Sequence, residues 1–200
     1  LKLYSGIRTS RQLIPCSGHV HSVDPIIRAS WIDRMLVERL ETKSFQIEQA
    51  LEVNKGDWED AFYQLLARNF GFHVNALPFE MLARVLPRNL LLRHAGQPQQ
   101  VEALVFGQAG LLKESFRDAY PVLLKKEHDF LSAKYGLLPL DGHIWKMLRM
   151  RPSNFPTVRL SQFASLVVSD GFGFRGVLES RDAVSVLEKL QVSASHYWSN

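Results

Sequence analysis

The residues best suited to chemistry lie in one short basic stretch. Its four cationic side chains fall within fourteen residues: Lys146, Arg149, Arg151 and Arg159. Arginine can bind phosphate oxygens through two parallel hydrogen bonds, and lysine attracts phosphate as a point charge. Pro152 and Pro156 stiffen the backbone, which would hold Asn154 and the arginines in fixed directions. We therefore predict nucleic-acid contacts by Lys146, Arg149, Arg151, Asn154 and Arg159.

Aromatic residues beside these charges support the same prediction. Trp145 and Phe155 could stack on bases, as aromatic side chains do in single-strand binding proteins. A second basic group, also suited to phosphate, comprises Arg84, Arg88, Arg93 and His94. The alternative interpretation is structural: Arg151 and Arg159 would bond carbonyls at helix ends, and Trp145 and Phe155 would belong to the core. The sequence leaves both interpretations open.

The sequence predicts no metal site. The possible ligands that lie close together are Cys16, His19, His21 and Asp24. Structural zinc usually takes two separated pairs of ligands, and the remaining histidines are scattered without matching spacing. Cys16 as a nucleophile would need a nearby base and a lowered pKa. We expect a buried cysteine and solvated histidines, with no metal and no other cofactor.

Catalytic patterns are equally weak. The glycine-rich residues 171–176 resemble a phosphate cradle, but no Lys-Ser/Thr pair follows and no strand precedes them. We expect a loop whose Phe172 and Phe174 return to the core. Glu59 and Asp60 lie in a predicted first helical turn, where acidic residues complement the helix dipole. We therefore assign no catalytic residue to this chain.

Apolar residues that recur at three- and four-residue intervals predict that most of the chain is helical. Asp24-Pro25 should begin a long helix that ends near residues 54–56, and Asp57 should cap a second helix that Gly71 ends. The apolar stripe expected on this second helix comprises Trp58, Phe62, Leu65, Leu66 and Phe70. Further helices are predicted at residues 78–87, 98–112, 120–135, 141–148, 156–167 and 183–190.

These patterns indicate an all-α fold with orthogonal or bundle-like packing. The chain has 200 residues, of which 46% are hydrophobic, which is enough for a substantial core. No Asn-Gly or Asp-Gly hairpin signal separates alternating runs. We expect a non-helical lead-in at residues 1–21 and a helical domain at residues 22–200.

The charge and cysteine content limit the class of protein. The formal net charge is +4 and the isoelectric point is about 9.3, which permits phosphate contact without demonstrating it. A single cysteine rules out an internal disulfide and fits a cytoplasmic location. The apolar runs are shorter than a membrane-spanning helix needs, so we expect no membrane partner. The chain starts at Leu1, which we interpret as a fragment of a longer protein.

Several motifs together resemble a bacterial family of uncharacterised proteins, the domain-of-unknown-function family 2851. They are Ile14-Pro15-Cys16, Trp31, Glu38-Arg39-Leu40, Lys43, Asp57-Trp58-Glu59, Phe62-Tyr63, Phe70-Gly71, Asn75, Phe79-Glu80, Phe106-Gly107-Gln108-Ala109-Gly110-Leu111-Leu112, Arg151-Pro152, Asn154-Phe155-Pro156-Thr157 and Arg159-Leu160. They run from about residue 14 to about residue 166. The resemblance implies the middle, helical portion of a longer protein, with a nuclease-like region before it and a cysteine-containing region after it.

Two functions follow as hypotheses. In the first, this helical module is not itself catalytic and positions nucleic acid for the neighbouring nuclease-like region. In the second, it is a protein-interaction or structural scaffold domain without nucleic-acid contact. The salt dependence of oligonucleotide binding distinguishes them, because phosphate contacts release counterions. The oligomeric state is not determined by the sequence.

Overall fold

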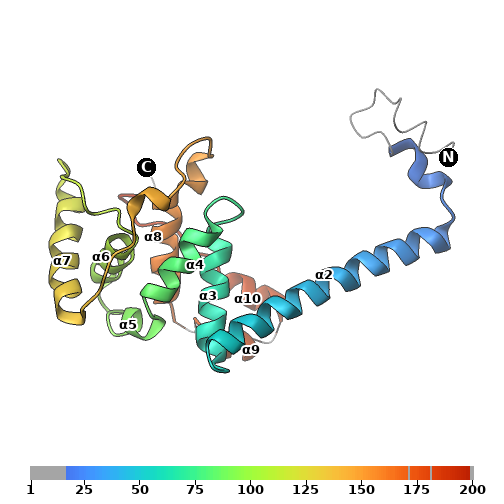
Figure 1. Cartoon of the computed structure of the whole chain (residues 1–200), viewed down its shortest axis with the longest axis horizontal. Coiled ribbons are helices and arrows are strands. Elements are labelled where there is room, and N and C mark those ends of the chain that lie inside the picture. Colours follow the sequence, from blue (N-terminus) through green and yellow to red (C-terminus); the bar gives the residue numbers. More distant parts are fainter. Residues whose placement is uncertain (1–16, 171, 181, 199–200) are drawn as a thin grey trace. The chain divides into compact units, whose positions relative to one another are not determined.

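The computed structural model describes residues 17–170, 172–180 and 182–198. Within these residues the secondary structure is helical and no strand occurs, so the predicted all-α class is confirmed (Figure 1). The elements in chain order are η1 (Ser17–Ser22), α2 (Pro25–Val53), α3 (Trp58–Phe70), α4 (Ala76–Val85), α5 (Arg88–Leu92), α6 (Pro98–Gln108), α7 (Ala119–Tyr135), η2 (Gly142–Ile144), η3 (Pro152–Asn154), α8 (Pro156–Val167), α9 (Phe174–Leu178) and α10 (Ala183–Lys189).

Local capping residues determine where several helices begin and end. The Asp24 carboxylate accepts the Ile26 amide at 2.8 Å at the start of α2. Asp57 accepts the amides of Glu59 and Asp60 at 2.8 and 3.0 Å at the start of α3. Gly136 ends α7 with a left-handed φ of 65°, which glycine adopts without steric penalty. The predicted ends of these helices are confirmed.

The chain divides into two compact units, residues 1–48 and residues 49–200. The first unit contains η1 and the larger part of α2. Within it, the Arg28 guanidinium donates to the Val20 carbonyl at 3.4 Å, and α2 contains no buried residue. The second unit contains the last turn of α2 and all later elements, and its core includes Tyr63, Phe79, Phe106 and Phe163.

Helix α6 lies at the centre of the second unit, against α4, α7 and α8 (Figure 1). Residues 101–108 are all buried, because neighbours cover this helix on every side. Gly107 allows the closest approach: a Cβ atom there would lie 2.0 Å from the His128 ring of α7. Glycine at this position thus permits close packing of α6 on α7, and α6 ends at Gln108, earlier than the predicted residue 112.

The end of α6 anchors the segment that leads to the basic stretch. Gly110 has a φ of 76°, and a Cβ atom at this position would lie 2.2 Å from the Leu140 carbonyl oxygen. The Leu140 amide donates to the Gln108 carbonyl at 2.9 Å, and the Trp145 indole donates to the Ala109 carbonyl at 2.7 Å. Residues 140 and 145 are therefore fixed against the end of α6.

This anchoring explains why the helix predicted at residues 141–148 is wrong. Only the single 3-10 turn η2 forms, although Asp141 does cap it by accepting the His143 amide at 3.0 Å. Trp145 is buried, whereas Leu148 is 86% exposed, so the two residues do not share a buried helical face. Hydrogen bonds from the Leu140 amide to Gln108 and from the Trp145 indole to Ala109 hold the segment against α6, and the chain does not continue as a helix beyond η2.

Three other expectations need correction. The fully buried residues of α3 are Ala61, Tyr63, Ala67 and Phe70, and Leu66 is partly buried against the core. The predicted stripe therefore holds at Leu66 and Phe70, and it missed Ala61, Tyr63 and Ala67. The neighbouring helices α4 and α8 approach the face that carries Tyr63, whose hydroxyl donates to the Leu86 carbonyl at 2.8 Å. The predicted loop at residues 171–176 continues into α9, because Glu59 caps that helix.

The third correction concerns the lead-in. Residues 17–22 form the 3-10 helix η1, a common short connector before a longer helix, so the non-helical prediction for residues 1–21 does not hold at its end. Residues 1–16 lie outside the described part of the chain, and Cys16 with them.

Candidate nucleic-acid interface

A buried asparagine joins two loops at the surface. Asn75 is 2% exposed and lies between α3 and α4. Its side-chain oxygen accepts the Lys146 amide at 2.9 Å, and its side-chain nitrogen donates to the Lys146 carbonyl at 3.0 Å. The same nitrogen lies 3.8 Å from the Met150 sulfur. We call this pair of main-chain hydrogen bonds the Asn75 clasp; it fixes residues 146–150 beside residues 71–75.

The clasped segment presents three of the predicted contact residues to solvent. Lys146, Arg149 and Arg151 are exposed, and their side chains make no hydrogen bond or ion pair with the residues that the structure describes. We call residues 146–151 the basic turn. Arg149 has a φ of 60°, a left-handed conformation that is uncommon outside glycine. The basic turn therefore carries three positive charges without a hydrogen-bond or ion-pair partner among the described residues, and the Asn75 clasp anchors its backbone.

Asn154 and Arg159 are placed differently. Asn154 ends the short η3 turn, is partly buried, and its amide donates to the Arg151 carbonyl at 2.9 Å. Arg159 lies in the first turns of α8, where its Nε donates to the Phe70 carbonyl at 3.3 Å and its Nη1 donates to Gln162 at 2.8 Å. Burial lowers the pKa of Arg159, yet a guanidinium remains charged at neutral pH. Arg159 thus bonds a carbonyl at a helix end, as the structural interpretation expected.

Two phenylalanine rings enclose the Arg159 guanidinium. Its central carbon lies 4.9 Å from the centre of the Phe70 ring and 4.5 Å from the centre of the Phe72 ring. Phe70 is buried, whereas Phe72 is 49% exposed. Phe72 was not among the predicted residues, since nothing in the sequence shows that a residue just past α3 packs on an arginine of α8.

The two aromatic residues predicted to stack on bases, Trp145 and Phe155, differ in burial. Trp145 is 5% exposed, donates to Ala109 and meets the Phe79 ring edge-on with centres 5.1 Å apart. It belongs to the core, as the structural interpretation expected, and cannot stack on a base. Phe155 is 36% exposed at the start of α8.

Most residues of the second basic group have hydrogen-bond or ion-pair partners within the protein. Arg84 pairs with Glu80 at 2.6 Å, and Arg88 pairs with Glu59 at 3.3 Å while donating to the Phe172 carbonyl at 3.1 Å. His94 is 9% exposed and bonds Gln100 and Tyr135 at 2.6 and 3.0 Å. Arg93 is exposed.

The glycine-rich segment does bind an anion, but the anion is a side chain of the protein. The Glu59 carboxylate accepts the amides of Phe174 and Arg175 at 3.0 and 2.9 Å. Gly173 has a φ of 137°, and a Cβ atom there would lie 2.5 Å from the same carboxylate. Phe174 stacks on Trp58 with ring centres 4.8 Å apart, and Phe172 packs against the core.

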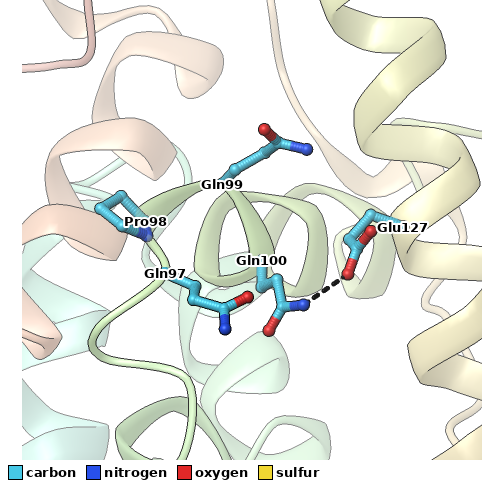
Figure 2. A pocket seen from close by; sticks show the side chains of 5 residues that line it. All are labelled: Gln97, Pro98, Gln99, Gln100 and Glu127. Carbon is cyan, nitrogen blue, oxygen red and sulfur yellow. Dashed lines mark hydrogen bonds between the residues drawn. The ribbon is translucent and has the colours of Figure 1, made fainter.

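A pocket of about 300 Å³ lies at the N-terminus of α6, and no residue of the basic turn lines it (Figure 2). Its lining residues are Gln97, Pro98, Gln99, Gln100 and Glu127. The Gln100 side chain donates to Glu127 at 2.6 Å, so its oxygen faces the His94 Nδ1 and requires a proton there. This polar chain offers amides and one carboxylate, and no nucleophile or cation lines the pocket.

Part of the possible metal-ligand group lies outside the described residues. Cys16 lies outside the described residues, as does the side chain of His19. Among the residues that are described, no three His, Cys, Asp or Glu side chains come together in a way that could hold an ion.

In the described part of the chain, no helix combines the length and apolar character needed to cross a bilayer.

Comparison with known proteins places the chain in a family. No curated protein and no solved structure matches the sequence. The sequence model described as "Protein of unknown function (DUF2851)" matches residues 1–200, so the chain belongs to that family.

Proposed function

We propose that the basic turn contacts the phosphates of a nucleic acid, with Lys146, Arg149 and Arg151 as the primary contacts. The observation that carries this proposal is the exposure of three neighbouring cations that lack a partner in the described residues, on a segment held by the Asn75 clasp. A surface that needed these charges for folding would pair them with carboxylates or carbonyls, as Arg84, Arg88 and Arg159 are paired.

Anchoring supports the proposal energetically. A flexible basic loop loses conformational entropy when it binds, which reduces affinity. The Asn75 clasp and the η3 turn restrict the backbone of the basic turn before any ligand arrives. We include Asn154 and Arg159 as secondary contacts: Arg159 would add positive charge, although its Nε and Nη1 are already bonded.

The test is the salt dependence of oligonucleotide binding. We expect the full chain to bind a labelled single strand of about 12 nucleotides with an affinity that falls as salt rises. The variant K146Q/R149Q/R151Q removes three contacts, so the slope of log affinity against log salt should become less steep by about 2.

A matched control removes the same charge elsewhere. Lys113, Arg117 and Lys126 are exposed residues outside both basic groups. The variant K113Q/R117Q/K126Q should retain most of the slope. Equal loss in the two variants would show that binding follows net charge alone, and absence of binding by the unmodified chain would refute the proposal.

A second candidate function is a protein-interaction module. It is favoured by α2, which contains no buried residue and exposes Trp31, Met35, Leu36 and Leu40. Exposed apolar residues in such number on one helix are typical of surfaces that partners cover. Flat or absent oligonucleotide binding across salt concentrations would favour this function over the first. That the module positions a strand for a neighbouring nuclease-like region stays a prediction.

A further inference from the structure

We infer that Phe72 is a stacking platform for a base and that the site therefore selects single-stranded nucleic acid over duplex. The inference rests on the proposed function of the basic turn and adds a residue and a ligand class to it. Three observations carry it: the backbone conformation of Phe72, the support behind its ring, and its position beside the basic turn.

Phe72 has a strained backbone conformation, and its side chain is exposed. Its φ is 50°, and the described non-glycine residues that share a positive φ are Lys55 and Arg149. For a bulky residue this conformation costs about 1–3 kcal/mol and tends to mark functional sites. Burial does not repay the strain, because the side chain is 49% exposed. Arg149 of the basic turn has the same type of strain, so each of the two clasped loops contains one such residue.

The ring is supported on one side. The Arg159 guanidinium lies 4.5 Å from its centre and is itself held by the Phe70 carbonyl, Gln162 and the Phe70 ring. A cation against an aromatic face is attractive and restricts the motion of the ring. A base that stacked on Phe72 would therefore meet a surface with little rotational freedom left to lose.

Phe72 lies on a loop that is joined directly to the basic turn. Asn75, three residues further along, bonds the Lys146 main chain directly, so the ring and the basic turn lie on joined loops. Phosphates on the basic turn would leave neighbouring bases within reach of the ring. Only a single strand offers an unpaired base for stacking, whereas duplex bases remain stacked on each other.

The experiment compares two variants of Phe72 on two ligands, a single strand of about 12 thymidines and a duplex of the same length. F72L keeps an apolar side chain but removes the flat ring. F72G removes the ring and also relieves the strain, because glycine accepts a positive φ, so it remains folded even if F72L does not. F72W restores a stacking face.

We expect F72L and F72G to weaken single-strand binding by about 5- to 150-fold, the range for loss of one stacked base. The salt slope should stay unchanged, because the phosphate contacts remain. Duplex affinity should not change, and F72W should retain the preference for a single strand. F130L, at an exposed phenylalanine of α7, should leave both affinities unaltered.

The outcomes separate this inference from the proposed function. Single-strand affinity that survives both F72L and F72G overturns the inference alone, provided that K146Q/R149Q/R151Q still weakens binding. An equal loss on duplex also overturns it. No binding by the unmodified chain, or binding to anionic vesicles in place of oligonucleotides, overturns both.

Discussion

At the scale of single residues, Gly107 allows α6 and α7 to approach each other. The His128 ring of α7 occupies the space where any side chain at position 107 would begin. His128 is 6% exposed, and its Nε2 lies 3.2 Å from the Gln108 side-chain nitrogen. Helix contact at this point depends on the absence of one methyl group.

We expect G107A to destabilise the protein by about 1–3 kcal/mol, the usual range for overpacking a buried site. Urea unfolding followed by circular dichroism measures the difference. G96A is the control, because a Cβ atom at Gly96 meets nothing within 4 Å. If G107A unfolds at the same urea concentration as the unmodified chain, the close contact with His128 is not present in solution.

His128 should also make stability depend on pH. Burial lowers the pKa of His128 below its ordinary value of 6.5, and nearby Asp129 opposes this shift only in part. The folded state therefore binds a proton less readily than the unfolded chain. Stability is fully present above pH 6.5 and falls as pH decreases from 6.5 towards the lowered folded pKa.

The measurement is the free energy of unfolding at about pH 7.5 and pH 5.5, on either side of the histidine pKa. The unmodified protein should lose more stability on acidification than H128N, which has no proton to gain at this position. Parallel losses in the two proteins would show that other groups cause the dependence.

At the scale of elements, α9 depends on a residue that is remote in sequence. Glu59, in the first turn of α3, accepts the first amides of α9 and pairs with Arg88. The first-turn position of Glu59 predicted an interaction with the dipole of its own helix. The structure shows in addition that its carboxylate caps a different helix.

E59Q should loosen α9 without unfolding the protein. A glutamine has one acceptor oxygen and no charge, and hydrogen bonds to charged groups contribute about 1.5–3 kcal/mol each. Hydrogen exchange at the amides of Phe174 and Arg175 should accelerate about tenfold or more, because 1.4 kcal/mol corresponds to a factor of ten. Exchange mass spectrometry of peptides that cover this helix measures the effect.

D60N is the matched control for E59Q. Asp60 is the next residue and loses the same charge, but its side chain makes no hydrogen bond to α9 among the described contacts. Comparable acceleration in both variants would show that charge near α3, and not the cap, protects α9.

The elements also show which parts of the fold the sequence could predict. Helix ends at Asp24, Asp57 and Gly136 were predictable because a cap acts within three or four residues. The path of residues 141–148 was not, because bonds from Asn75 and Ala109 determine it and their partners lie 71 and 36 residues away. The same holds for Arg159: its charge could be read from the sequence, but its contacts with the distant Phe70 and Phe72 rings could not.

At the scale of the whole molecule, one buried carboxylate connects several elements of the 49–200 unit. Glu102 of α6 is 4% exposed and accepts hydrogen bonds from Ser161 at 2.8 Å, Tyr120 at 2.6 Å and Trp198 at 3.2 Å. Burial, together with the hydrogen bond to Glu102, raises the pKa of Tyr120. The Trp198 ring also stacks on Phe106 with centres 4.3 Å apart. Helices α6, α7 and α8 and the C-terminal segment thus share one acceptor.

We expect E102A to destabilise this unit by about 3 kcal/mol or more, since three donors lose their partner and each unsatisfied group costs about 1–3 kcal/mol. E102Q should have a smaller effect, because one acceptor oxygen remains. E188A, on the exposed side of α10, should change stability by less than about 0.5 kcal/mol. Thermal and urea unfolding of the three variants test this order, and equal effects of E102A and E188A would contradict it.

The Asn75 clasp has a consequence for how this surface can change. Both of its hydrogen bonds end on main-chain atoms of residue 146, so no atom of the lysine side chain takes part in the anchoring. Any amino acid with an amide proton can occupy that position while the loop keeps its path. Ligand preference at this point can therefore be altered by substitution, in nature or in the laboratory, without rebuilding the scaffold beneath it.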